Sequence, residues 1–206
     1  GTWADGPLRP FDADISQPVA AQLRGFERLG LSDEDTAWLW RAAELDQLAW
    51  QQEFGRNHDR AGLVCEANVF RYRPVLTPLQ VRVAEDAQLR DVARLALAAT
   101  RTGSPVRLSA TPDKATELRG LGFDVEALSA EAFAREVAGL ESARVRTVGS
   151  VEPGVYEAAV QSNSVVLDQP VLADGRRELL PFLLEQAVSV TMHRFGIIRE
   201  VGSIRA

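Results

Sequence analysis

The chain has 206 residues and a formal net charge of −6, with 46% hydrophobic and 25% charged residues. These values are typical of one large or two small folded domains. Binding to the phosphate backbone of nucleic acid needs clustered Lys and Arg. The negative net charge therefore argues against nucleic acid and anionic membrane surfaces as partners. No apolar stretch approaches the ~20 residues of a transmembrane helix. The single cysteine, Cys65, cannot form an internal disulfide, and we expect a reducing, cytoplasmic location.

The first elements in chain order are an arm and a helical pair. Residues 1–17 carry prolines and glycines with little periodicity, so we expect a linker or an extended arm. Because the chain begins with Gly1 rather than Met, we expect a fragment of a longer protein or a tag remnant. Residues 18–57 show the apolar spacing of two helices. Ser32 to Asp35 resemble a capping box at the start of the second helix, and Gly55 is expected to help end it.

Strand and helix signals alternate over residues 62–168, which we interpret as an α/β unit. Val64 to Tyr72 alternate in polarity and predict a strand or an extended crossing segment. Further strands are predicted at 79–84, 106–109, 124–128, 144–148 and 165–167, with helices at 89–100, 115–121, 130–140 and 155–161. Such alternation implies right-handed βαβ units. The predicted fold class is therefore α/β, with a Rossmann-like, mostly parallel sheet and flanking helices.

The turns that would bind a dinucleotide lack the usual glycines. In a dinucleotide-binding sheet, the first strand-to-helix turn carries glycines so that the backbone can approach the pyrophosphate. Here that turn is Glu85 to Gln88, which has no glycine and presents two carboxylates that would repel phosphate. We interpret Asp86 as the cap of a helix that begins near Ala87. The next such turn, Ser109 to Lys114, also lacks glycine. The sequence therefore predicts no cofactor-binding residue.

No catalytic or metal-binding set is recognisable. Cys65 stands on a predicted strand, where a buried thiol is usually inert. The histidines, His58 and His193, are far apart and lack the spacing of a zinc site. We interpret His58 as a solvated loop residue and His193 as a residue that holds the tail by side-chain hydrogen bonds. The sequence predicts no catalytic residue and no metal site.

The last predicted unit, residues 169–196, is a flap or hairpin followed by an apolar tail. Its apolar residues are Leu179, Leu180, Phe182, Leu183, Leu184, Val188, Val190 and Phe195. They supply more apolar area than one edge element normally exposes, so either this domain or a partner covers them. For the leucines, core and interface are equal alternatives, whereas residues 192–196 favour an interface. The predicted docking residues are Val188, Val190, Met192, His193, Arg194, Phe195 and Gly196.

Three segments carry a resemblance to a known family. They are Gly62 to Pro74, Pro170 to Arg176 and Glu185 to Gly196. They resemble the opening stretch, the flap and the closing motif of the C-terminal domain in long proline utilization A proteins. These proteins pair an FAD-dependent proline dehydrogenase with an NAD-dependent glutamate semialdehyde (pyrroline-5-carboxylate) dehydrogenase. The resemblance spans roughly residues 18–196 and leaves a terminal extension, residues 197–206, without assignment.

The resemblance implies an aldehyde-dehydrogenase-superfamily fold that is not catalytic. The fragment itself would bind no cofactor, whereas the parent chain would use NAD and FAD. The domain would dock on the aldehyde dehydrogenase domain of the same or a neighbouring chain, support assembly and help close a substrate-channelling cavity. The Gly-Gln-x-Cys nucleophile motif of those dehydrogenases has no match here, and the nearest analogue of their Lys-Pro turn is Thr111-Pro112.

Two other functions stay open at this point. The chain could be an independent NAD-binding oxidoreductase domain, which calorimetry with NAD would detect. It could also be a plain oligomerisation module that pairs strands through residues 165–180, and light scattering would then show a stable dimer.

Overall fold

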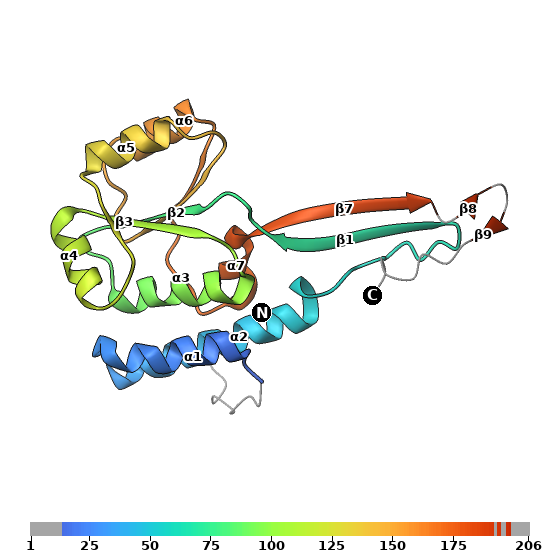
Figure 1. Cartoon of the computed structure of the whole chain (residues 1–206), viewed down its shortest axis with the longest axis horizontal. Helices are drawn as coiled ribbons and strands as arrows, with labels where there is room; N and C mark the ends of the chain where they lie inside the picture. Colours follow the sequence, from blue (N-terminus) through green and yellow to red (C-terminus); the bar gives the residue numbers. More distant parts are fainter. Residues whose placement is uncertain (1–13, 192, 195–196, 199–206) are drawn as a thin grey trace.

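The computed structural model describes residues 14–191, 193–194 and 197–198. A five-stranded parallel sheet with the order β4-β3-β2-β5-β6 lies at the centre of the body (Figure 1). Its strands are β2 (Leu79–Val83), β3 (Val106–Ala110), β4 (Glu126–Ala127), β5 (Arg144–Val148) and β6 (Val165–Leu167). The chain starts on the central strand, moves outward to β4 and crosses back to β5. This order confirms the predicted α/β, Rossmann-like class.

Helices cover both faces of this sheet (Figure 1). On one face lie α3 (Leu89–Thr102), α4 (Pro112–Gly120) and α7 (Gly175–Leu179). The other face is covered by α5 (Ala130–Ala138) and α6 (Val155–Gln161). The helical pair, α1 (Gln17–Gly25) and α2 (Asp33–Ala49), forms a further layer. Leu39 of this layer and Leu97 of α3 belong to one buried cluster.

Local sequence signals explain where several helices begin. The Ser32 hydroxyl accepts a hydrogen bond from the Asp35 amide at 3.1 Å and donates one to the Asp35 carboxylate at 2.8 Å. This reciprocal pair resembles a capping box in which the hydroxyl replaces the cap amide as donor. Serine is a preferred N-cap directly before a helix, and Ser129 accepts a hydrogen bond from the Ala132 amide at 3.2 Å at the start of α5. No helix of the described residues is both long and apolar enough to cross a bilayer.

The predicted strand at 64–72 has a partner that local patterns did not reveal. The predicted strand is β1 (Glu66–Pro74). Its partner is β7 (Leu183–Thr191), near the other end of the chain, and the two strands are antiparallel. Together they form a two-stranded ribbon that projects from the body (Figure 1). Two short strands, β8 (His193–Arg194) and β9 (Ile197–Ile198), pair with each other near its tip.

The apolar stretch before β7 is divided between core and surface. Leu179 of α7 and the short helix η3 (Leu180–Phe182) lead directly into β7. Leu179, Phe182 and Leu183 are buried in the main core, while Leu180 and Leu184 are about 40% exposed. The core alternative therefore holds for Leu179 and Leu183, whereas an interface at Leu180 and Leu184 stays a prediction. Residues 1–13 of the predicted arm and 199–206 of the predicted extension lie outside the described residues.

Candidate docking site

The crevice at the carboxyl ends of β2 and β5 is where an open α/β sheet would bind a ligand. From β2 the chain moves to β3 on one side of the sheet and later returns to β5 on the other side. The strand order therefore reverses between β2 and β5, which is the topological switch point. Asp86, just after β2, accepts hydrogen bonds at Oδ1 from the Ser150 amide at 2.9 Å and the Ser150 hydroxyl at 3.1 Å. The hydrogen bond from the Ser150 amide is the main cause that lowers the pKa of the Asp86 carboxyl. A carboxylate therefore bridges the two loops that border the crevice.

This bridge corrects the prediction that Asp86 caps the following helix. The N-cap of α3 is Gln88, because the Asp86 side chain turns to the loop after β5 instead. Gly149 permits the approach: its φ is +86°, and a Cβ there would lie 2.4 Å from Asp86 Oδ1. Glu85 accepts a hydrogen bond from the Thr111 hydroxyl, so it also contacts a neighbouring loop. The Ser150 amide, a donor that a phosphate would need, is already used.

Other residues that the sequence analysis singled out also have defined places. His58 is not simply solvated, because its Nε2 lies 2.8 Å from the Glu53 carbonyl oxygen and its backbone pairs with Phe70. Cys65 is exposed and precedes β1, so its predicted burial on a strand is wrong. Among the residues that the structure describes, no group of three or more His, Cys, Asp or Glu could hold a metal ion.

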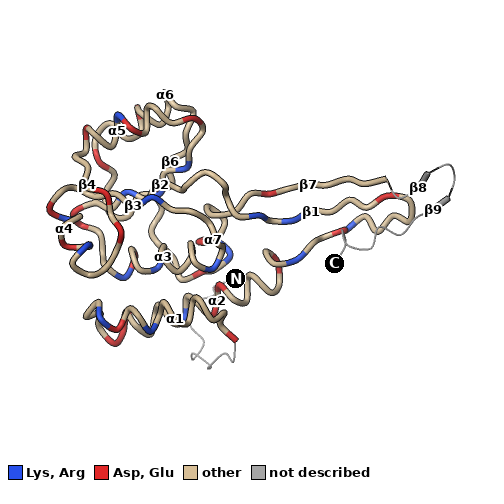
Figure 2. The backbone as a smooth tube through the Cα atoms, viewed as in Figure 1, with Lys and Arg blue, Asp and Glu red and all other residues tan. Residues whose placement is uncertain are grey.

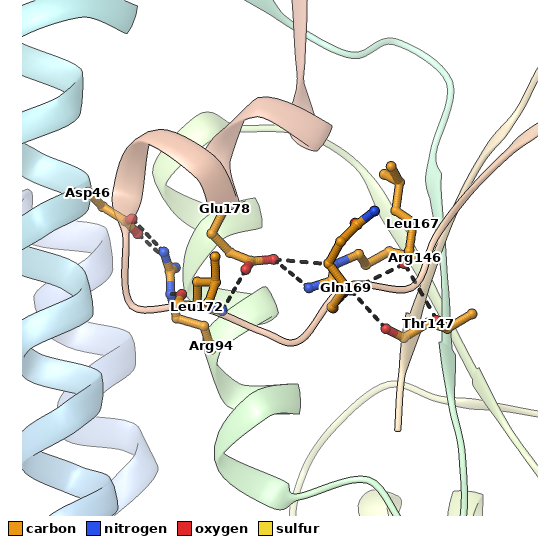
Figure 3. Close-up of polar contacts among 8 residues, drawn as sticks. All are labelled: Asp46, Arg94, Arg146, Thr147, Leu167, Gln169, Leu172 and Glu178. Atoms are coloured by element: carbon orange, nitrogen blue, oxygen red, sulfur yellow. Dashed lines mark hydrogen bonds and ion pairs between the residues drawn. The ribbon is translucent and has the colours of Figure 1, made fainter. Parts of the chain in front are cut away.

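The root of the ribbon is anchored by a first buried ion pair (Figure 3). Asp46 of α2 and Arg94 of α3 are both fully buried and form two hydrogen bonds of 2.6 and 2.9 Å. Arg94 Nε also donates to the Leu172 carbonyl oxygen at 3.0 Å. Burial raises the pKa of Asp46 to about 6, although Arg94 acts in the opposite direction. The pair therefore joins both helices to the loop that precedes α7.

A second buried pair holds the same loop from the sheet side (Figure 3). Arg146 of β5 lies 3.1 Å from the Glu178 carboxylate of α7 and donates to the Gln169 carbonyl oxygen at 2.6 Å. Glu178 in turn accepts from the Leu172 amide at 2.8 Å. Buried ion pairs are tolerated only when their remaining donors and acceptors are satisfied, as they are here. Because α7 leads through η3 into β7, this network fixes the start of the ribbon.

Gly175, at the start of α7, allows a close approach to α2. A Cβ at this position would lie 2.5 Å from the Leu45 carbonyl oxygen and 2.6 Å from the Asp46 amide nitrogen. Asp174 caps α7 by accepting hydrogen bonds from the Arg176 and Arg177 amides. The start of α7 is thus a point of close contact with α2.

The ribbon itself has an apolar face and a free edge. Ala67 and Val69 of β1 are buried and lie directly opposite Val190 and Val188, which are half-buried. Leu184 to Ala187 on β7 are exposed. Within the described residues, β7 pairs only with β1, so its outer edge has no strand partner. An unpaired edge is a template for another strand or chain.

Basic residues of β1 lie in the half of the strand nearest the body, as Figure 2 shows. They are Arg71 and Arg73. The Arg71 Nε donates to the Gln186 side-chain oxygen at 2.7 Å, which adds a cross-strand contact to the ladder. The inner half of β1 is therefore cationic, while the paired part of β7 carries one acidic residue, Glu185.

Four of the seven predicted docking residues lie in the ribbon or next to its tip. Val188 and Val190 are on β7, and His193 and Arg194 form β8. The other three, Met192, Phe195 and Gly196, lie outside the described residues. Local sequence signals did not indicate β1 as the partner of this segment, although β1 and most of β7 belong to segments that carry the family resemblance.

Comparison with known proteins gives an informative likeness among solved structures. No family model and no curated protein matches the sequence. Among solved structures, the chain is similar to Proline Utilization A (PutA) from Corynebacterium freiburgense, with 37% identity and a TM-score of 0.63. The alignment covers 94% of this chain and 16% of the PutA chain. The chain is a PutA-related domain. The predicted resemblance to proline utilization A is therefore confirmed, while its C-terminal position and its likeness to aldehyde dehydrogenases stay predictions.

Proposed function

We propose that this chain is a non-catalytic domain of a bifunctional enzyme that converts proline to glutamate. Its ribbon would dock on the NAD-dependent aldehyde dehydrogenase domain of the same or a neighbouring chain, support assembly and help close a cavity that channels the semialdehyde intermediate. The observation that carries the proposal is the projecting ribbon, with a fixed root and a free edge, in a PutA-related chain.

The crevice at the switch point supports the non-catalytic part of the proposal. The residues present do not fit a dinucleotide, because Asp86 places a carboxylate at the mouth of the crevice and already binds the Ser150 amide. A pyrophosphate there would meet negative charge in place of a glycine-rich cradle. We therefore assign the NAD and FAD of the proposed enzyme to other domains of the parent chain.

The ribbon supports the docking part. A partner strand added to the β7 edge would gain main-chain hydrogen bonds, and alternate side chains would supply specificity. The buried pairs Arg94–Asp46 and Arg146–Glu178 hold the root, so little conformational entropy would be lost when the ribbon docks.

The test is a truncation in the full-length parent protein. Removal of residues 185–196 should lower the coupled flux from proline to glutamate, while each active site retains its activity toward substrate supplied from solution. Val160→Asp is the matched control, because Val160 is 81% exposed on α6, away from the ribbon. Unchanged coupled kinetics together with an unchanged oligomeric state in the truncated protein would contradict the proposal.

A plain oligomerisation module is the second candidate, and the free β7 edge favours it because two copies could pair there. Light scattering of the chain would then show a stable dimer that the truncation abolishes. An independent NAD-binding domain would instead show micromolar binding of NAD in calorimetry.

A further inference from the structure

A hollow of about 780 Å³ lies at the root of the ribbon. Its lining includes Phe70 and Tyr72 of β1, which point to the opposite face of the strand from Ala67 and Val69. The end of the helical pair, the loop that follows it and α7 complete the lining. The hollow and the ribbon therefore have strand β1 in common.

The aromatic wall of this hollow is fixed in place. The Tyr72 ring makes edge-to-face contacts with Phe54 at 4.8 Å and with Phe70 at 5.1 Å between ring centroids. The Phe70 backbone exchanges hydrogen bonds of 2.8 and 2.9 Å with His58. A side chain that enters the hollow would meet a rigid apolar surface, and such surfaces cost little ordering entropy on binding.

A glutamate that lines the hollow, Glu53, already has polar partners. Tyr72 donates to Glu53 Oε1 at 3.0 Å, and Arg176 contacts the same carboxylate through Nε at 2.7 Å and Nη2 at 3.4 Å. Burial, followed by the Glu53 hydrogen bond, raises the pKa of Tyr72 to about 12, so its hydroxyl stays a donor. The only carboxylate among the lining residues is therefore neutralised locally.

Positive charge is left over at the rim. Arg60 lines the hollow, is exposed and forms no ion pair with the residues that the structure describes. The Arg176 side chain remains 71% exposed despite its contact with Glu53. Two arginines against one glutamate give this part of an acidic chain a net positive charge. A carboxylate is the group that complements it.

The hollow also continues onto the ribbon. Asn68 belongs to its lining, and the Asn68 side-chain oxygen accepts a hydrogen bond from the Ser189 hydroxyl of β7 at 2.7 Å. A partner domain that docks along this face of the ribbon would thus also contact the hollow.

We infer that the hollow receives an acidic side chain from the surface of the domain on which the ribbon docks. The carboxylate would lie between Arg60 and Arg176, and its methylene stem would pack on Phe70. This inference rests on the proposed function, because the occupant belongs to the proposed docking partner.

The experiment uses charge reversal in the full-length parent protein. Arg60→Glu is compared with Arg56→Glu, which makes the same charge change on an exposed loop residue outside the lining, and with Arg60→Lys. The readout is hydrogen exchange of the outward-facing β7 amides. We expect Arg60→Glu to accelerate this exchange by about tenfold, because a like charge replaces a complementary one at the contact. Arg56→Glu and Arg60→Lys should stay close to the unaltered protein.

The outcomes separate this inference from the proposed function. Equal effects of Arg60→Glu and Arg56→Glu, or no effect of Arg60→Glu on protected β7 amides, would overturn the inference and leave ribbon docking intact. Free exchange of the β7 amides in the unaltered parent would instead overturn ribbon docking. Binding of millimolar glutarate at Arg60 in the isolated chain, with β7 exchange unmoved by Arg60→Glu, would identify a free acid as the occupant and would also overturn the inference.

Discussion

The root of the ribbon and the strand β7 that leaves it differ in how their polar groups are satisfied. At the root, the Arg94–Asp46 and Arg146–Glu178 pairs are buried and bonded on several sides. Along β7, by contrast, Leu184 to Ala187 are exposed, and the far edge of the strand has no strand partner among the described residues. The body fixes the position of the ribbon, and the ribbon presents groups that another surface can use. The rigidly held part of the segment and the part that is available for binding are thus adjacent to each other.

Removal of one charge from the root should give the largest effect. Arg94→Met leaves Asp46 buried without its partner, and loss of one member of a buried pair typically costs about 3–5 kcal/mol. The measurement is denaturant unfolding of the chain. Glu44→Gln is the control, because its pair with Arg41 on the same helix is partly exposed and should contribute under about 1 kcal/mol. Equal losses in the two variants would contradict the special role of the root.

The cost of Arg94→Met should also depend on pH. Burial holds the pKa of Asp46 at about 6, above its ordinary value of 3.8, and Arg94 opposes that rise. Loss of Arg94 should raise this pKa further, so the folded variant binds a proton that the unfolded chain has released. Its stability should then fall as pH rises above about 4, and over a wider pH range than in the unaltered chain. Unfolding curves at pH 5 and pH 8 measure the difference, and a larger loss at pH 5 would contradict it.

A methyl group at Gly175 should have the next effect. Gly175→Ala places a Cβ within 2.6 Å of the α2 backbone, so α7 must shift away from Asp46. Overpacking of this kind costs about 1–3 kcal/mol. Gly120→Ala is the matched control, because a Cβ there would have no heavy atom within 4 Å beyond its chain neighbours and the backbone of its own helix. Similar unfolding midpoints for both variants would show that the close approach of α7 is not needed.

Within the ribbon, the two strands should differ. Val69 is 2% exposed, whereas Val188, directly opposite on β7, is half-buried. Val69→Ala should lower the free energy of unfolding by about 1–2 kcal/mol, from ~0.8 kcal/mol per buried CH₂, and Val188→Ala by less. A larger loss from Val188→Ala would mean that the chain itself, without a partner, depends on the outer strand.

The parts of the fold that the sequence predicts are those with local causes. The alternation of strands and helices from residue 79 onward and the Ser129 cap depend on neighbours a few residues apart. The β1–β7 pairing joins residues more than 100 positions apart, for example Arg71 and Gln186, and neither strand alone indicates its partner. Two segments of the family resemblance nevertheless contain β1 and most of β7, so the resemblance locates the ribbon in the sequence without showing its geometry.

The buried arginines could not be predicted for a related reason. Arg is rarely fully buried unless it is paired, and the partners of Arg94 and Arg146 lie 48 and 32 residues away. Asp86 shows the same limit, because its capping role was a local inference and its actual partner, Ser150, is 64 residues away. Long-range polar contacts therefore determine both how the root of the ribbon is held and which groups occupy the crevice.

The smallest expected effect concerns the crevice and tests whether the body is closed to ligands. Asp86→Ala should leave the unfolding midpoint unchanged, because Asp86 and Ser150 are exposed, but hydrogen exchange of the Ser150 amide should accelerate. The variant should still bind no NAD in calorimetry, because the turn from Glu85 to Gln88 offers no glycine for a pyrophosphate to approach. Micromolar NAD binding by Asp86→Ala would mean that one carboxylate alone closes a complete nucleotide site. The contrast between a closed body and an available ribbon would then depend on a single side chain rather than on the whole architecture of the crevice.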